Sequence, residues 1–256
     1  MRSNGVGFVL VAVATVAKAE RTGPLMSVSY SVISIGTLSR NRLWGEQEAR
    51  RTPHATTTLV RSGTTTILVD PSVPAEVLRF RLDERTGMRP EQIEVVYLTT
   101  FRPIHRRSLA MFPHATWLMH EPEIEATRDH LADLNARLEE VGDGADDEVV
   151  RLVRDERELL GRIHPAGERL TPQVHLYPTP GVTPGASGLL LATPSRTIVI
   201  AGDCVVTQAH FEAGRVFEQV SDLEQARASL QDVYEVADEV VPGHDNAFRV
   251  SGRLDR

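Results

Sequence analysis

The sequence of 256 residues contains a single cysteine, Cys204, a single lysine, Lys18, and few aromatic residues, 5% in all. One cysteine cannot form an intramolecular disulfide, so the cysteine content does not require an oxidising compartment. Positive charge is also scarce, because 28 basic residues stand against 35 acidic ones and leave a net charge of −7. This balance argues against a nucleic-acid-binding protein, which needs a basic face to displace counterions.

The apolar run near the N-terminus, residues 6–17, is too short to cross a bilayer as a helix. Ala17-Lys18-Ala19 follows it and has the small-x-small form of a signal-peptidase site. Two interpretations stay open. Either residues 1–19 are the signal peptide of an exported protein, or residues 1–25 are a mis-assigned extension of a cytoplasmic protein, which we favour. Under both, residues 26–256 are expected to form a single domain.

Hydrophobic residues make up 41% and charged residues 25% of the sequence, as in soluble globular proteins. Short β-branched and alternating segments predict strands over residues 28–35, 56–61, 65–69, 95–98, 174–177, 188–192 and 197–200. Helical patterns cover residues 75–86 and a segment that begins at a capping box, Ser221-Asp222-Leu223-Glu224, with Leu223 facing inward. Strands in runs, with helices between some of them, predict a mixed α/β domain with at least two sheets.

The segment from Glu121 to Glu168 is dense in Arg, Glu and Asp and predicts a helical hairpin at about residues 121–168. The hairpin is interrupted at Gly142-Asp143-Gly144, and its second helix is expected to place Val149 and Leu152 on the inward face. Its charges are typical of a solvated face, and a surface for a protein partner is the alternative.

Five short stretches follow one another along the chain: Ile67-Leu68-Val69-Asp70, Tyr97-Leu98-Thr99-Thr100-Phe101-Arg102-Pro103-Ile104-His105, Thr179-Pro180-Gly181-Val182-Thr183-Pro184-Gly185, Ile200-Ala201-Gly202-Asp203 and Val241-Pro242-Gly243-His244. In order and spacing they resemble the signature of the metallo-β-lactamase superfamily, whose second stretch reads Leu-Thr-His-x-His-x-Asp-His and whose third reads Thr-Pro-Gly-His-Thr-Pro-Gly. The resemblance covers roughly residues 28–247. It implies a four-layer αββα sandwich with the site at the sheet edges where these loops converge.

The resemblance implies that, in active members of this superfamily, seven ligands from these stretches hold two metal ions. Carried over position by position, four of the seven ligand positions hold a residue that is not the expected ligand: Thr100, Arg102, Ile104 and Val182. The other three positions hold the expected ligand: His105, Asp203 and His244. Thr is a poor zinc ligand, Arg stays protonated and has no lone pair, and Ile and Val have no donor atom. One ion position therefore retains nothing but the bridging Asp203, so we expect no dinuclear centre.

The three remaining donors leave two alternatives open. His105, Asp203 and His244 amount to two imidazoles and one carboxylate, a set that can hold a single Zn²⁺ or non-haem Fe²⁺. Alternatively, the three side chains are hydrogen-bonding residues of a site without a metal or other cofactor, which we favour.

Without metal ions, Asp203 is an isolated anion in a partly desolvated pocket, which is unfavourable unless the carboxylate is paired or protonated. We predict that Arg102, which stands where a ligand imidazole is expected, forms a salt bridge with Asp203 and substitutes for the missing cation. The alternative for Arg102 is an ordinary surface side chain.

Three functions follow from these patterns. The first, which we favour, is a non-hydrolytic pseudoenzyme that binds a small molecule or a protein partner. The second is a mononuclear zinc or iron hydrolase or oxygenase that uses His105, Asp203 and His244. The third is an assembly module that acts through the acidic hairpin. No pattern in the sequence selects a substrate, because one fold supports many functions.

Overall fold

The structure is a computed structural model that describes residues 27–144 and 146–251. The N-terminal segment for which we weighed a signal peptide, residues 1–25, lies outside the described residues. Within the described part of the chain, no helix is both long enough and apolar enough to cross a membrane.

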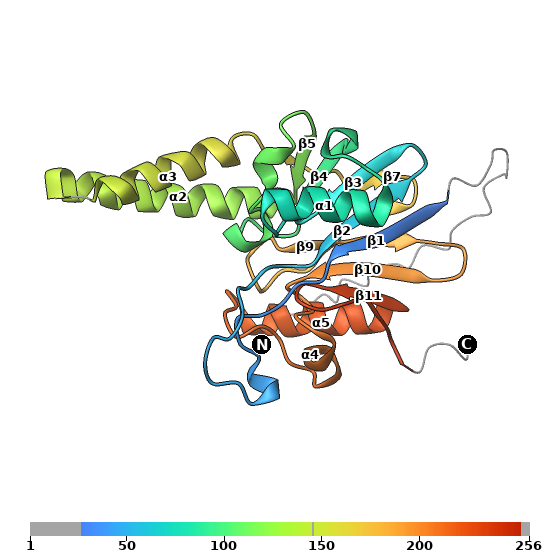
Figure 1. Ribbon diagram of the computed structural model, residues 1–256. Helices are drawn as coiled ribbons and strands as arrows, with labels where there is room; N and C mark the ends of the chain where they lie inside the picture. Colours follow the sequence, from blue (N-terminus) through green and yellow to red (C-terminus); the bar gives the residue numbers. More distant parts are fainter. Residues whose placement is uncertain (1–26, 145, 252–256) are drawn as a thin grey trace, which may run out of the picture.

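Two six-stranded sheets form the centre of the molecule (Figure 1). The first sheet follows the chain order β1 (Val28–Ser34), β2 (Thr57–Ser62), β3 (Thr65–Val69), β4 (Val95–Leu98), β5 (Thr116–Met119) and β6 (His164–Pro165). The second sheet has the order β12 (Phe248–Arg249), β11 (Glu239–Pro242), β10 (Thr197–Gly202), β9 (Ser187–Ala192), β8 (Val174–Pro178) and β7 (Arg169–Thr171). Strands β3 to β6 pair in parallel, as do β10 and β11, and the remaining pairs are antiparallel.

Helices cover the outer faces of both sheets (Figure 1). The first sheet carries α1 (Ala75–Thr86), α2 (Glu121–Val141) and α3 (Asp147–Leu160), and the second carries α4 (Gln208–Glu212) and α5 (Leu223–Val236). Short 3₁₀ turns lie between them: η1 (Arg42–Trp44), η2 (Pro90–Gln92), η3 (Pro103–His105), η4 (Leu109–Met111) and η5 (Gly142–Gly144). The four layers are the αββα sandwich that the sequence motifs implied.

The alternation of side chains along the strands explains why the sheets are buried on both faces. In β3, Ile67 and Val69 belong to the core between the sheets, whereas Leu68 packs with the helices outside the first sheet. In β10, Ile198 likewise belongs to the core between the sheets, and Val199 packs with α5. The parallel strands place their carboxyl ends at common sheet edges, and the loops that follow them build the site.

The α2–α3 hairpin extends beyond the sheets (Figure 1). Ile124, Leu131 and Leu160 near its base are buried in the core outside the first sheet. The prediction that Val149 and Leu152 face inward is wrong, because these side chains are 42% and 59% exposed. The prediction of a helix for this segment is correct, but the tip of the hairpin extends past the layer that would cover these two side chains.

The start of α5 also differs from the prediction. The N-cap is Asp222, whose side chain accepts a hydrogen bond from the Gln225 backbone N–H, so the helix begins one residue later than the capping box indicated. The Ser221 hydroxyl instead donates to the Gly181 carbonyl, and Leu223 is 44% exposed. Ser221 thus ties the helix entry to the third sequence motif.

Candidate functional site

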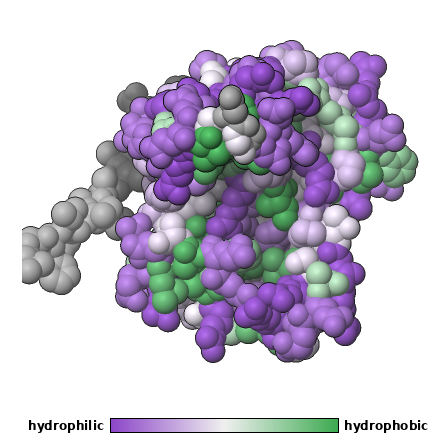
Figure 2. All heavy atoms as spheres, turned by 90° about the vertical axis from the view of Figure 1, so that its left-hand side faces the viewer, coloured by the Kyte–Doolittle hydropathy of each residue, from purple (hydrophilic) through white to green (hydrophobic). Residues whose placement is uncertain are grey.

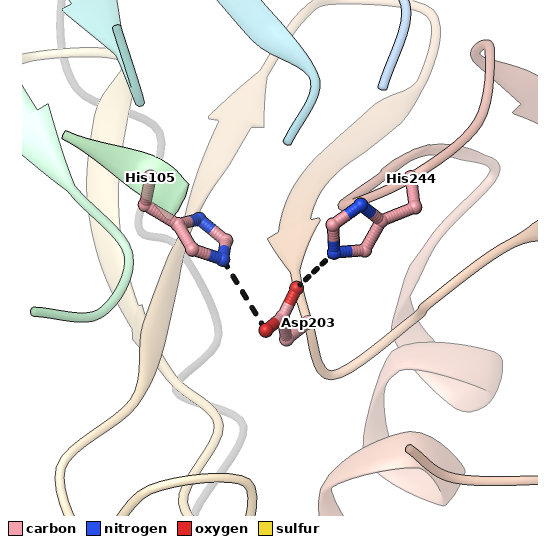
Figure 3. A group of neighbouring side chains, drawn as sticks. All are labelled: His105, Asp203 and His244. Atoms are coloured by element: carbon pink, nitrogen blue, oxygen red, sulfur yellow. Dashed lines mark ion pairs between the residues drawn. The ribbon is translucent and has the colours of Figure 1, made fainter. Parts of the chain in front are cut away.

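Three residues that the motif resemblance singled out come together where the two sheets meet the loops after their strands (Figure 3). His105 ends the η3 turn after β4, Asp203 follows β10, and His244 follows β11. His105 is fully buried, and Asp203 and His244 are 4% and 5% exposed. Their ligand atoms lie within 4.8 Å of one another.

The Asp203 carboxylate lies between the two imidazole rings (Figure 3). His105 Nε2 is 3.2 Å from Asp203 Oδ2, and His244 Nε2 is 3.1 Å from Asp203 Oδ1. These contacts are at ion-pair distance, yet His105 Nε2 and Asp203 Oδ1 have no hydrogen-bond partner. The three side chains therefore point their potential metal-ligand atoms at one another. A cation bound between them would satisfy these atoms.

The other nitrogen of each ring fixes the orientation of that ring. His105 Nδ1 donates to Asp70 Oδ2 at 2.9 Å, and His244 Nδ1 donates to the His54 carbonyl at 3.0 Å, because a carboxylate and a carbonyl can only accept. Asp70 also accepts from the Thr99 backbone N–H at 2.9 Å and from its hydroxyl at 2.7 Å. Both Nε2 atoms are thereby oriented toward Asp203, as in metal-binding histidines.

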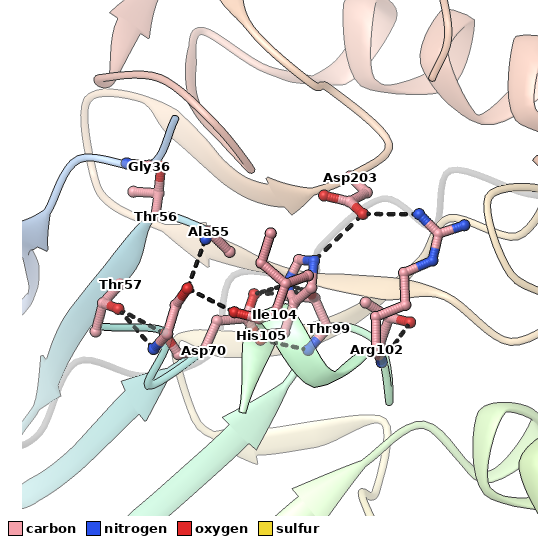
Figure 4. A network of polar contacts seen from close by, with 12 residues as sticks. Gly36, Ala55, Thr56, Thr57, Asp70, Thr99, Arg102, Ile104, His105 and Asp203 are labelled. Carbon is pink, nitrogen blue, oxygen red and sulfur yellow. Dashed lines mark hydrogen bonds and ion pairs between the residues drawn. The ribbon is translucent and has the colours of Figure 1, made fainter. Parts of the chain in front are cut away.

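Arg102 is directed into the site (Figure 4). Its Nη1 lies 3.2 Å from Asp203 Oδ2, and its Nη2 donates to the carbonyls of Val182 at 3.2 Å and Gln219 at 2.7 Å. The guanidinium also lies over the Phe217 ring, 5.1 Å from its centroid. The predicted ion pair is thus present, while the role of Arg102 as a substitute for a metal cation stays a prediction.

At the other three positions where the sequence resemblance expects a metal ligand, the residues are Thr100, Ile104 and Val182. Thr100 is buried, and its hydroxyl donates to Glu123 Oε1 at 2.8 Å. Ile104 contributes its carbonyl to the Ser72 hydroxyl at 2.6 Å, and the Val182 side chain is buried. Thr100 thus braces its loop through its side chain and Ile104 through its backbone carbonyl.

Charges around the site shift the pKa values of two groups. Burial disfavours the charged form of His105, but the neighbouring Asp203 and Asp70 carboxylates outweigh burial and raise its pKa to about 10. Burial likewise disfavours the Asp203 carboxylate, but His105 and His244 outweigh it and hold the Asp203 pKa well below its usual range. Cys204 is buried next to this site, and burial raises the pKa of its thiol, so it stays protonated.

A pocket of about 290 Å³ opens above Asp203. Its apolar walls come from Leu38, Pro53, Ile104 and Phe217. Its polar lining consists of Ser39, Arg102, Asp203, Gln219 and His244. Phe217 stacks on the His244 ring with 6.5 Å between centroids. Figure 2 shows this side of the molecule hollowed beneath the hairpin, with hydrophilic surface inside the hollow and hydrophobic patches at its rim.

Sequence reasoning missed two residues that shape the site. Glu123 is buried and joins two motif loops, because it accepts from Thr100 and from the Gly185 backbone N–H at 3.1 Å. Phe217 comes from a loop without any recognisable pattern. An acidic residue in the first turn of a helix usually indicates a favourable helix-dipole interaction, so no sequence signal pointed to the role of Glu123.

Comparison with known proteins gives no match to a family model and no match to a curated protein sequence. Solved structures do match. A probable metal-dependent hydrolase from Staphylococcus aureus aligns with a TM-score of 0.63 and 14% identity over 89% of this chain and 93% of its own. A hydrolase of the β-lactamase superfamily aligns with a TM-score of 0.59 and 16% identity over 91% of this chain and 94% of its own.

The chain has the metallo-β-lactamase fold. AidC, a dizinc quorum-quenching lactonase, has the same fold, with a TM-score of 0.56 and 16% identity over 74% of this chain and 72% of its own. At this level of identity the similarity establishes the fold alone. The metallo-β-lactamase fold of this chain therefore carries a buried His-Asp-His group that could hold a metal, and its chemistry has to be argued from its own residues.

Proposed function

We propose that this metallo-β-lactamase-fold protein is a non-hydrolytic pseudoenzyme that binds a small ligand in the pocket above Asp203. The observation that carries the proposal is the ion pair between Arg102 and Asp203. Three acceptors hold the guanidinium, so its position beside Asp203 is built into the loops. By the sequence resemblance, an active member of the superfamily would carry a metal-binding imidazole at this position.

The charges of the buried cluster support this proposal. Asp70 and Asp203 contribute two negative charges, and Arg102 and protonated His105 contribute two positive charges. These charges balance one another without any metal ion, so each buried carboxylate has a cationic partner that offsets the cost of its burial. Hydrolysis in two-ion centres relies on a metal that lowers the pKa of bound water to about 7, and the remaining donor set cannot hold such a pair.

The test is the metal content of protein purified with a tag that does not bind metal and without chelators. We expect zinc and iron well below one ion per chain, with no change in His244→Ala. Near-stoichiometric metal that is lost in His244→Ala would overturn the proposal. Arg107→Ala, at an exposed arginine of the same loop, is the control for non-specific effects.

A specific observation favours a second candidate, a mononuclear zinc or iron hydrolase or oxygenase. His105 Nε2 and Asp203 Oδ1 are buried without a hydrogen-bond partner, and both rings are held by their Nδ1 atoms. His105, Asp203 and His244 would hold the ion, which would supply a Lewis acid. The metal measurement above decides between the two candidates.

The third candidate, assembly through the hairpin, rests on the exposed apolar residues near its tip, Val141, Val149, Val150 and Leu152. If this surface mediates assembly, replacing Val149 and Leu152 by serine should reduce the molar mass in light scattering. An unchanged mass would remove this candidate.

A further inference from the structure

A second cavity, of about 470 Å³, lies between the base of the hairpin and the segment that carries Arg102. Ala126, Thr127 and His130 of α2 line one side, and Phe101 and Arg102 line the opposite side. Arg102 also lines the central pocket, so this side chain borders both spaces. The cavity contains none of the three metal-donor candidates.

The buried charges around this cavity are already compensated within the protein. Arg106 forms an ion pair with Glu156, donates from Nε to the Phe101 carbonyl at 2.6 Å, and lies over the Phe101 ring at 4.0 Å. Glu123 accepts hydrogen bonds from Thr100, from the Phe101 backbone N–H at 3.1 Å, and from Gly185. A charged ligand would have to compete with these contacts.

The rest of the lining is largely apolar. Pro103, Ala126, Leu131 and Pro184 contribute carbon surface. Thr127, His130 and Thr183 add polar groups. Apolar surface with a few polar groups is typical of small-molecule pockets, and the volume lies within their usual range. Such a ligand would also not disturb the paired charges, because it brings no charge of its own.

We propose that this cavity, the hairpin cavity, is a binding site for an uncharged, predominantly apolar small molecule. The inference goes beyond the proposed function, because it holds whether or not His105, Asp203 and His244 bind an ion. Since Arg102 borders both spaces, a ligand in the hairpin cavity would contact the same side chain that pairs with Asp203.

The experiment uses two fluorescent probes with the same ring system, uncharged N-phenyl-1-naphthylamine and its 8-sulfonate. Fluorescence titration of the full-length protein should give tighter binding of the uncharged probe, by roughly tenfold or more. Ala126→Trp fills the cavity and should weaken binding of the uncharged probe by roughly tenfold or more. Ala132→Trp, at an exposed position of the same helix, is the matched control and should bind like the wild type.

Several outcomes would overturn the proposal. Equal binding by the two tryptophan variants would place the probe elsewhere, and absence of binding to the wild type would remove the site. Tighter binding of the sulfonate would identify Arg102 and Arg106 as anion-binding groups instead. Circular dichroism and light scattering of both variants check the fold and the molar mass, and a mass change confined to Ala126→Trp would indicate a protein interface at this cavity.

Discussion

The side chain at residue 102 determines which charge lies beside Asp203. An imidazole at that position would offer a lone pair to a metal ion, whereas a guanidinium carries its own positive charge and only donates hydrogen bonds. Arg102 can therefore meet Asp203 directly, at 3.2 Å. The Asp203 carboxylate is thus the partner of a cation that the protein itself supplies.

Replacing Arg102 by alanine should lower the stability of the protein. The change leaves Asp203, which is 3% exposed in its side chain, with one cationic partner fewer, and we expect a loss of about 1–3 kcal/mol in the free energy of unfolding. The stability of Arg102→Lys should lie between those of the wild type and of Arg102→Ala, because lysine keeps the positive charge but lacks the planar guanidinium group. Urea unfolding measures the effect against Arg107→Ala as control. Equal stabilities of the two alanine variants would contradict the role of Arg102.

The raised pKa of His105 predicts a pH dependence of stability in the metal-free protein. The imidazolium is stabilised in the folded state, since its pKa rises from 6.5 to about 10. Its contribution to stability is therefore complete below pH 6.5 and is lost as the pH rises through about 10. The Asp203 carboxylate acts in the opposite direction, because its pKa is lowered, and its contribution is lost in strong acid.

Urea unfolding with a chelator present should therefore show stability falling between pH 6.5 and pH 10. His105→Gln removes the titrating group and should flatten this part of the profile. If wild type and variant lose stability in parallel over that range, another group is responsible and His105 is not protonated in the folded protein.

At the scale of elements, local patterns predicted the parts of the fold that depend on neighbouring residues. The strand around residues 65–69 and the helix at 75–86 have the bounds of β3 and α1, because β-branched alternation and helical periodicity are local signals. The short strands β6 and β12, with two residues each, carry no such signal. The exposure of Leu152 could not be predicted either, since it depends on how far the hairpin extends beyond the sheets.

The candidate site was predictable where its residues follow strands in recognisable motifs. Asp203 and His244 each follow such a strand, so the sheet brings them to one edge. Glu123 and Phe217 were not predictable, because they reach the site through tertiary contacts with residues distant in sequence. The sequence thus indicated which side chains meet and left open which other elements hold them.

The contact between the third motif and α2 leads to a prediction at Gly185. A Cβ atom at this position would lie 2.0 Å from the Glu123 backbone nitrogen and 2.4 Å from the Pro122 carbonyl carbon. Gly185→Ala should therefore destabilise the protein by about 3 kcal/mol or more, or prevent folding. Gly167→Ala is the control, because its nearest neighbouring atom would be 4.0 Å away. Thermal unfolding compares the two, and an equally stable Gly185→Ala would show that the loop is not packed against α2 in this way.

For the molecule as a whole, the four-layer scaffold does not by itself determine the chemistry of the site. The chain aligns over 91% of its length with a hydrolase of the β-lactamase superfamily at only 16% identity, so the layers tolerate extensive sequence change. The positions at which the sequence resemblance expects further metal ligands lie on loops at the sheet edges. Loops tolerate substitution more readily than a packed core, so side chains at these positions can differ between proteins of this fold without disturbing the layers.

The converse prediction is that restoring the donors should restore metal binding. The variant that combines Thr100→His, Arg102→His, Ile104→Asp and Val182→His regains all seven ligand types on the same loops. It should bind up to two zinc ions per chain, and its melting temperature should fall when a chelator is added, because Asp203 no longer has Arg102 as its partner. The triple variant that keeps Arg102 is the matched control and should bind one ion at most, since the guanidinium repels a cation at the first position. A quadruple variant that folds but binds no more metal than the triple variant would show that the loops, and not only the missing donors, prevent a two-ion centre.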